Sequence, residues 1–272
     1  MTVINRIDQC IQARLNVRQK VLIPFITTGD PGLEETLTLM HALVEGGADI
    51  LELGVPFSDP MADGPIIQRA SDRAVKRGVG LSDVFNTVKK FREHNQHTAV
   101  VLMGYANPIE AMGVTTFVTQ AKNVGVDGVL VVDYPPEEVE ELSQTMANEN
   151  IYPIFLLAPT TSSKRVQSVA QHAKGYVYYV SLNGVTGAGH LDTKQVKTRI
   201  HTLREHISIP IGVGFGIRDA ETAVTLAETA DAVVIGSRLV QLIEETPPEQ
   251  LESTLRTWIH EVRKALDTHY HA

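Results

Sequence analysis

The sequence has 272 residues, a formal net charge of −8 and a single cysteine, Cys10. Its basic residues are scattered, which argues against a nucleic-acid or anionic-membrane surface, and one cysteine excludes a disulfide framework or a cysteine-rich metal site. The N-terminus lacks the basic and apolar regions of a signal peptide, and no apolar stretch is long enough to cross a bilayer. We therefore expect a soluble, cytoplasmic protein.

Strand-like and helical segments alternate along the whole chain. Apolar residues at Ile4, Ile7, Ile11 and Leu15 predict an N-terminal helix with one apolar stripe that covers the core. Short apolar runs then predict eight strands, at Val21–Thr27, Asp49–Gly54, Thr98–Met103, Gly128–Val132, Tyr152–Leu157, Tyr176–Ser181, Ile209–Val213 and Ala232–Ile235.

Helical segments follow each of these strands. They are predicted at Leu33–Glu45, Ala70–Arg77, Leu81–Glu93, Thr115–Asn123, Glu137–Asn148, Ser163–Ala173, Thr193–Glu205 and Asp219–Glu228, in a helix that opens at Gly236-Ser237, and at Leu251–Leu266. Eight strand–helix units without a linker predict a (β/α)8 TIM barrel as a single domain over residues 1–272. The barrel carries an extra N-terminal helix and additional helices after strands 2 and 8.

The second strand and its loop contain the most informative residues. Glu52 lies in the middle of an apolar strand, where a carboxylate is costly unless it is paired, hydrogen-bonded or neutralised. A salt bridge beneath the following loop is one interpretation. Asp63 stands just before Gly64-Pro65, where it could cap the next helix. A carboxylate on a strand and another on the loop beyond its C-terminal end are also how general acid–base pairs are built.

Glycines gather after the sixth, seventh and eighth strands. They occur in Gly184–Gly189, in Gly214-Phe215-Gly216 and at Gly236-Ser237, which opens a helix. Free N–H groups at a helix N-terminus attract anions, and loops 7 and 8 of a barrel are the recurrent phosphate site. Glycine is also the ordinary residue of tight turns, so the grouping, rather than any single glycine, predicts a phosphate site.

Apolar side chains near the strand ends are candidate walls for an apolar ligand. They are as often core as pocket, and loop position favours Tyr105 and Phe215 among Phe25, Tyr105, Leu130, Phe155, Tyr178 and Phe215. Histidines such as His94 and His97 lie in a charged stretch typical of a surface, so we expect no metal site. No Ser-His-Asp order or nucleophile elbow is apparent.

Several motifs together resemble the tryptophan synthase alpha subunit family across essentially the whole chain. The most specific is Leu51-Glu52-Leu53-Gly54-Val55-Pro56-Phe57-Ser58-Asp59-Pro60 with Ala62-Asp63-Gly64-Pro65. Others in the same order are Pro24–Pro31, Tyr105-Ala106-Asn107-Pro108, Gly184-Val185-Thr186-Gly187, Gly214-Phe215-Gly216-Ile217 and Gly236-Ser237. The resemblance implies cleavage of indole-3-glycerol phosphate to indole and glyceraldehyde 3-phosphate, with no organic cofactor in this chain.

Residue roles follow from the same resemblance. It implies that Glu52 is the general acid–base and that Asp63 faces the indole N–H. It places the substrate phosphate at Gly187, Phe215, Gly216, Gly236 and Ser237, and it makes Phe25, Tyr105, Leu130, Tyr178 and Thr186 pocket or loop residues. A beta subunit carrying pyridoxal phosphate is the implied partner in an α2β2 assembly. That partner would receive the indole through a tunnel and join it to L-serine.

Two alternatives remain from the sequence. One keeps the barrel and phosphate site but changes the reaction to that of a sugar-phosphate isomerase or an indole-glycerol-phosphate synthase. The synthase would need a catalytic lysine on a strand, and none stands on the predicted strands. The other alternative is a non-catalytic subunit that only binds and activates a partner, and intact carboxylates at Glu52 and Asp63 argue against it.

Overall fold

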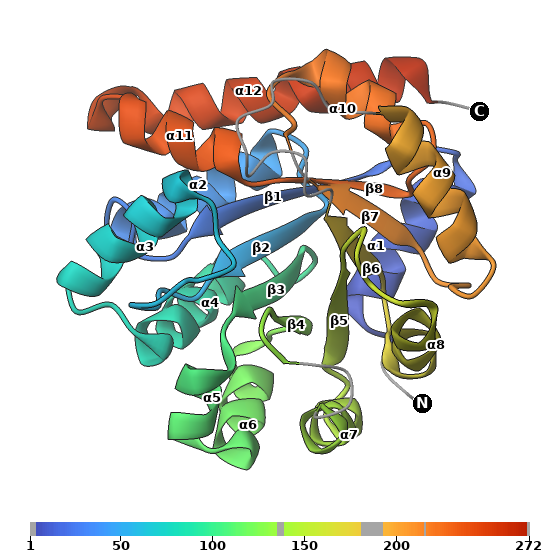
Figure 1. The fold of residues 1–272 in the computed structure, drawn as a ribbon. Helices are drawn as coiled ribbons and strands as arrows, with labels where there is room; N and C mark the ends of the chain where they lie inside the picture. The colour runs from blue at the N-terminus through green and yellow to red at the C-terminus, as the bar shows by residue number, and fades with distance from the viewer. Residues whose placement is uncertain (1–3, 135–138, 181–192, 215, 271–272) are drawn as a thin grey trace.

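The computed structural model describes residues 4–134, 139–180, 193–214 and 216–270. Eight parallel strands close a barrel in chain order, with β1 paired to both β2 and β8 (Figure 1). This confirms the predicted fold class. The strands are β1 Val21–Thr27, β2 Ile50–Gly54, β3 Ala99–Gly104, β4 Gly128–Val131, β5 Tyr152–Leu157, β6 Val177–Val180, β7 Ile211–Gly214 and β8 Ala232–Ile235.

Helices surround the strands (Figure 1). The N-terminal helix and the paired helices after β2 and β8 were all expected. In chain order the helices are α1 Arg6–Asn16, α2 Leu33–Glu45, α3 Pro65–Lys76, α4 Leu81–His94, α5 Ala106–Met112, α6 Val114–Val124, α7 Glu140–Asn148, α8 Ser163–His172, α9 Thr193–Arg204, α10 Ala220–Ala227, α11 Ser237–Glu245 and α12 Pro248–His269.

The helix α5 corrects the sequence analysis, which treated Tyr105-Ala106-Asn107-Pro108 as a loop. Tyr105 is the N-cap and Pro108 lies in the first turn of the helix. Proline is tolerated there because the first N–H groups of a helix have no intrahelical partner. The helix α3 begins at Pro65, directly after Gly64, where the sequence places the start of the helix that follows Asp63. The helical segment expected from Ala70 onward is the second half of this longer helix.

Alternation along the strands decides which side chains fill the barrel. On β2, Ile50 belongs to the cluster inside the barrel, whereas Leu51 and Leu53 pack in the layer between strands and helices. Side chains two residues apart share one face of a strand. Glu52 therefore points into the barrel, above Ile50 and toward the C-terminal end of the strand.

The helix α1 covers the N-terminal end of the barrel. Its Ile7 and Ile11 are buried in the interior cluster. Ile7 approaches the backbone closely, since a Cβ on Gly175 would lie 2.8 Å from its Cγ2 atom, and Gly175 has a φ of +72°. The predicted apolar stripe is correct for these two residues. Ile4 departs from it, because it precedes the helix and is 59% exposed.

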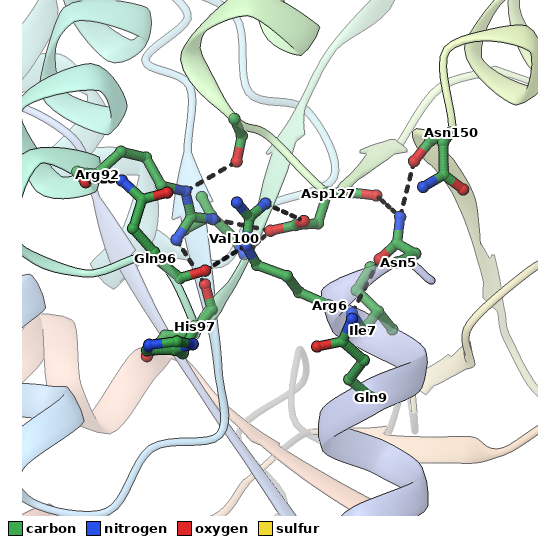
Figure 2. Close-up of polar contacts among 12 residues, drawn as sticks. Asn5, Arg6, Ile7, Gln9, Arg92, Gln96, His97, Val100, Asp127 and Asn150 are labelled. Atoms are coloured by element: carbon green, nitrogen blue, oxygen red, sulfur yellow. Dashed lines mark hydrogen bonds and ion pairs between the residues drawn. The ribbon is translucent and has the colours of Figure 1, made fainter. Parts of the chain in front are cut away.

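A polar network fastens α1 to the strands (Figure 2). The Asp127 carboxylate accepts hydrogen bonds from Arg6 Nη1 at 2.9 Å, Arg92 Nη2 at 2.8 Å and the Val100 N–H at 2.8 Å. Asn5 caps α1 by accepting a hydrogen bond from the Ile7 N–H, and it donates to the Asp127 carbonyl at 2.9 Å. Asp127 thereby joins α1, α4 and β3 at one point.

We expect Asp127→Ala to destabilise the protein by about 3–5 kcal/mol, because it leaves the charge of the buried Arg92 guanidinium without the carboxylate that balances it. The side chains of Asp127 and Arg92 are only 4% and 7% exposed. The free energy of unfolding, measured in urea, tests this. The control is Glu252→Ala, which removes the exposed ion pair to Arg256 and should cost less than about 1 kcal/mol. Equal effects of the two substitutions would show that the network contributes little.

Candidate active site

Glu52 is buried on the inner face of β2, with 1% of its surface exposed. The Tyr176 hydroxyl donates a hydrogen bond to its Oε1 atom at 3.3 Å. Its Oε2 atom is buried and has no hydrogen-bond partner among the described residues. Burial raises the pKa of Glu52 to about 7, and the hydrogen bond from Tyr176 opposes this rise. In the described part of the chain Glu52 is hydrogen-bonded rather than salt-bridged, so this carboxyl can exchange a proton near neutral pH.

Asp63 does not cap the next helix. The N-cap of α3 is Gly64, and no side chain caps it. Asp63 instead accepts a hydrogen bond from the Tyr105 hydroxyl, with 3.0 Å between that oxygen and Oδ2. Burial raises the pKa of Asp63 to about 6, and the hydrogen bond from Tyr105 lowers it. Asp63 therefore loses its proton at a lower pH than Glu52.

Tyr178 lies near both carboxylates. It belongs to β6 and stands two residues after Tyr176, which directly precedes this strand, so the two side chains point the same way. Burial raises the pKa of the Tyr178 hydroxyl, and the negative charges of Glu52 and Asp63 raise it further. A Cβ on Gly214 of the neighbouring β7 would overlap this hydroxyl. The glycine therefore leaves room for the tyrosine at the strand end, and the site combines two carboxylates with three tyrosine hydroxyls.

Some of the predicted pocket residues line a cavity, and others are packed in the core. Phe25, Asp63 and Tyr105 line one small cavity of 20 Å³, together with Met103 and Val132. Leu130 is fully buried in the interior cluster and does not line that cavity. Phe155 was wrong as a pocket candidate, because it packs in the layer between the strands and the helices.

The predicted phosphate residues are described only in part. Gly236 is the N-cap of α11 and has no capping side chain, and Ser237 is the exposed first residue of that helix. Gly216 has a φ of +68°, a conformation that glycine adopts readily. Gly187, Thr186 and Phe215 lie outside the described residues. The described part offers the N–H groups of a helix N-terminus, which suit an anion.

Two polar residues of this region, Tyr176 and Ser71, are not singled out by the sequence. The sequence predicts a strand at Tyr176, and its two-residue spacing from Tyr178 could have indicated that both side chains point into the barrel. Ser71 falls in a predicted helix, and the structure shows that it lines the same cavity as Asp63. Its hydroxyl bonds to the backbone of Phe57, fourteen residues earlier. The sequence around Ser71 gives no indication of this contact with Phe57.

The helix α3, which follows the Asp63 loop, is anchored by ion pairs. Arg73 donates to both oxygens of the buried Asp30, from Nε at 2.8 Å and from Nη2 at 2.7 Å. Arg73 also contacts Glu244 of α11 at 2.8 Å, and Arg69 joins the same glutamate at 2.6 Å. Paired contacts between guanidinium and carboxylate groups are geometrically specific. They hold α3 against both the loop after β1 and the helix whose N-terminus carries Ser237.

Other features of the described residues lie away from this site. A larger groove of 640 Å³ lies between α10 and α12, and none of the predicted site residues lines it. Among the described residues, no group of three or more His, Cys, Asp or Glu side chains could hold a metal ion. In the same part of the chain, no helix combines the length and the apolar character needed to span a bilayer.

Comparison with known proteins points in one direction. The sequence model of the tryptophan synthase alpha chain family matches residues 11–268. The tryptophan synthase alpha chain of Burkholderia ambifaria is 59% identical over 263 residues, with 97% of each chain covered. That of Janthinobacterium sp. is 57% identical and covers 97% of this chain and 99% of its own.

Solved structures agree. The alpha subunit of tryptophan synthase from Legionella pneumophila superposes with a TM-score of 0.91 at 42% identity, covering 98% of this chain and 100% of its own. A chain of the Pyrococcus furiosus tryptophan synthase complex gives a TM-score of 0.82 at 38% identity, covering 90% and 98%. The chain belongs to the tryptophan synthase alpha chain family, the lyases that cleave indole-3-glycerol phosphate to indole and glyceraldehyde 3-phosphate in tryptophan biosynthesis.

Proposed function

We propose that Glu52 and Asp63 perform this carbon–carbon cleavage, with Glu52 moving protons and Asp63 facing the indole nitrogen. The observation that carries the proposal is the difference between the two carboxyl groups. Glu52 is fully buried with a pKa of about 7, and Asp63 is half-buried with a pKa of about 6. Carboxyl groups whose surroundings separate their pKa values are suited to different roles in acid–base chemistry.

Glu52 would act twice in one turnover. Protonated Glu52 gives its proton to indole C3, which leaves an iminium ring and a Glu52 carboxylate. The carboxylate then takes the proton of the adjacent side-chain hydroxyl while the bond between C3 and the side chain breaks. The bonding electrons return to the ring, the hydroxyl carbon becomes the aldehyde of glyceraldehyde 3-phosphate, and Glu52 is protonated again. A pKa of about 7 allows both transfers at neutral pH.

Asp63 would stabilise the positive charge that the ring nitrogen gains when C3 is protonated. This requires an ionised carboxylate, and a pKa of about 6 leaves Asp63 mostly ionised at neutral pH. The Tyr105 hydroxyl donates to one carboxylate oxygen, Oδ2, so the other oxygen can accept the ring N–H. Activity should therefore fall below about pH 6, where Asp63 gains a proton, and above about pH 7, where Glu52 loses one.

The substrate phosphate would bind at the N-terminus of α11. Gly236 and Ser237 supply backbone N–H groups and a hydroxyl there, and Gly187, Phe215 and Gly216 are the further residues that we assign to this phosphate site. Phe25, Tyr105, Leu130, Tyr178 and Thr186 are assigned to the walls and closing loop around the indole. Binding a phosphate away from the reacting bond helps to orient the substrate.

The partner that we propose is a tryptophan synthase beta subunit, in an α2β2 assembly in the cytoplasm. Solved structures of the Pyrococcus furiosus relative include its α2β2 complex. In the present chain, the loop that carries Asp63 also presents Met61, which is 83% exposed. An exposed methionine beside the site suits an adaptable contact with another protein. Pyridoxal phosphate would be bound by the partner, which would join indole to L-serine.

Indole release from indole-3-glycerol phosphate tests the function. The purified chain should release indole slowly alone and faster when a tryptophan synthase beta subunit is added. Serine is left out of the first assay so that indole accumulates rather than being consumed. A folded chain that binds the substrate but releases no indole under either condition would be a binding subunit. Unchanged release on adding the beta subunit would contradict the partner assignment while leaving the lyase activity in place.

A further inference from the structure

Ser71 makes an unusual pair of hydrogen bonds in the second turn of α3. Its hydroxyl accepts a hydrogen bond from the Phe57 N–H at 2.9 Å and donates one to the Phe57 carbonyl at 2.8 Å. The residue is 4% exposed. Serine and threonine within helices commonly bond to the carbonyl four residues earlier, as Thr87 does with Asp83. Ser71 instead binds the backbone of one residue in the Asp63 loop at two points.

Phe57 carries this attachment to Tyr105. The rings of Phe57 and Tyr105 are stacked, with 5.3 Å between centroids and 29° between planes. Stacked aromatic rings at this separation attract each other by more than their area burial alone. The position of the Phe57 backbone therefore affects the position of the Tyr105 ring.

Tyr105 in turn holds the other end of the loop. Its hydroxyl accepts a hydrogen bond from the Ala62 N–H at 3.1 Å and donates one to Asp63 Oδ2 at 3.0 Å. The loop is thus attached to α3 through Phe57 and to Tyr105 through Ala62 and Asp63. Ser71, Asp63 and Tyr105 also line the same cavity.

We propose that Ser71 is a positioning residue for the cleavage reaction: by fixing Phe57 it sets the Tyr105 ring and, through that ring, the direction of the Asp63 carboxylate. This inference rests on the proposed role of Asp63. Among the described residues the Ser71 hydroxyl is hydrogen-bonded to Phe57, and neither Glu52 nor Ser237 is among its hydrogen-bond partners. We therefore expect its effect on the reaction to be exerted through Asp63. Small misplacements of a catalytic group reduce rates strongly, by up to about a hundredfold for 1 Å.

The first test is Ser71→Ala in the full-length chain. We expect kcat for indole release to fall about tenfold or more, with a smaller change in KM because the phosphate and ring contacts remain. Ser143→Ala is the matched control. Ser143 is also a buried serine, 6% exposed, on α7, and its hydroxyl has no partner among the described residues. That control should retain the kcat of the parent protein.

Two further variants separate positioning from general packing. Ser71→Thr keeps the hydroxyl and should recover most of the lost kcat. In a Tyr105→Phe background residue 105 no longer donates a hydrogen bond to Asp63, so adding Ser71→Ala should lower kcat much less than it does in the parent protein. Additive losses would place the effect of Ser71 elsewhere and overturn the inference, as would an unchanged kcat in folded Ser71→Ala.

Failure of this inference can be told apart from failure of the proposed function. If Asp63→Asn is severely impaired but Ser71→Ala is not, Asp63 keeps its role and Ser71 is not its positioning residue. If Asp63→Asn retains full activity, the role of Asp63 itself is wrong. Thermal unfolding of each variant identifies any loss of activity that arises from loss of the fold.

Discussion

Glu52→Gln should lose about a thousandfold or more of the turnover of the parent protein while keeping its fold. Glutamine has nearly the shape of glutamate and can accept the hydrogen bond from Tyr176, but its amide neither gives a proton to C3 nor takes one from the hydroxyl. The measurement is kcat for indole release by the isolated chain. Glu261→Gln, on the exposed face of α12, is the control and should retain activity.

The same variant makes a prediction about stability. Burial raises the pKa of Glu52 from about 4.5 to about 7, so the folded protein keeps a proton that the unfolded chain releases between these values. The unfolded state is then favoured progressively as the pH rises through this range. Glu52→Gln removes this dependence, and the variant should be more stable than the parent protein at pH 8.

Near-normal turnover in Glu52→Gln would refute the assignment of Glu52 as the general acid–base.

Asp63→Asn should lower kcat by about a hundredfold or more, because a neutral amide cannot balance the charge on the ring nitrogen. The amide oxygen can still accept the hydrogen bond from Tyr105, so the loop should keep its position. Asp59→Asn provides the matched control, since Asp59 lies in the same loop but is exposed, and the hydrogen bond described for its side chain is the one from the Ser58 hydroxyl. Both variants are assayed as isolated chains, without a beta subunit.

The pH profile adds a second criterion for Asp63. In the parent protein, kcat/KM should fall on the acid side with a midpoint near the pKa of about 6. The substrate phosphate, with a second pKa of about 6, contributes to the same limb and is common to all variants. Asp63→Asn should retain only the phosphate contribution and show a shallower limb. An unchanged limb together with full activity would remove Asp63 from the chemistry.

The strands and most helices could be predicted because their signals are local. The run Val21–Thr27 is apolar and β-branched, and the structure places β1 at the same residues. The N-terminal cover could be predicted from the spacing of Ile7 and Ile11. The sequence does not indicate α5, because Pro108 is typical of a turn and the first turn of a helix tolerates proline as well.

The arrangement of the site was less accessible because it depends on contacts distant in sequence. Asp63 and Tyr105 are 42 residues apart, and Glu52 and Tyr176 are 124 apart. A strand pattern shows that Glu52 faces the barrel interior but not which hydroxyl it meets. It equally cannot show that Asp63 turns to Tyr105 rather than to the N-terminus of α3. These two contacts depend on the three-dimensional course of the loops, which the sequence pattern does not specify.

The position of α1 over the N-terminal end of the barrel determines at which end the product can leave. Ile7 and Ile11 pack against the interior cluster, and Asp127 holds the helix α1 in place. The N-terminal end of the barrel is therefore closed by α1. In the mechanism that we propose, indole forms beside Glu52 and would leave at the opposite, C-terminal rim, past the loop that holds Asp63. A protein bound to that rim would cover this exit and could bind the indole before it reaches bulk water.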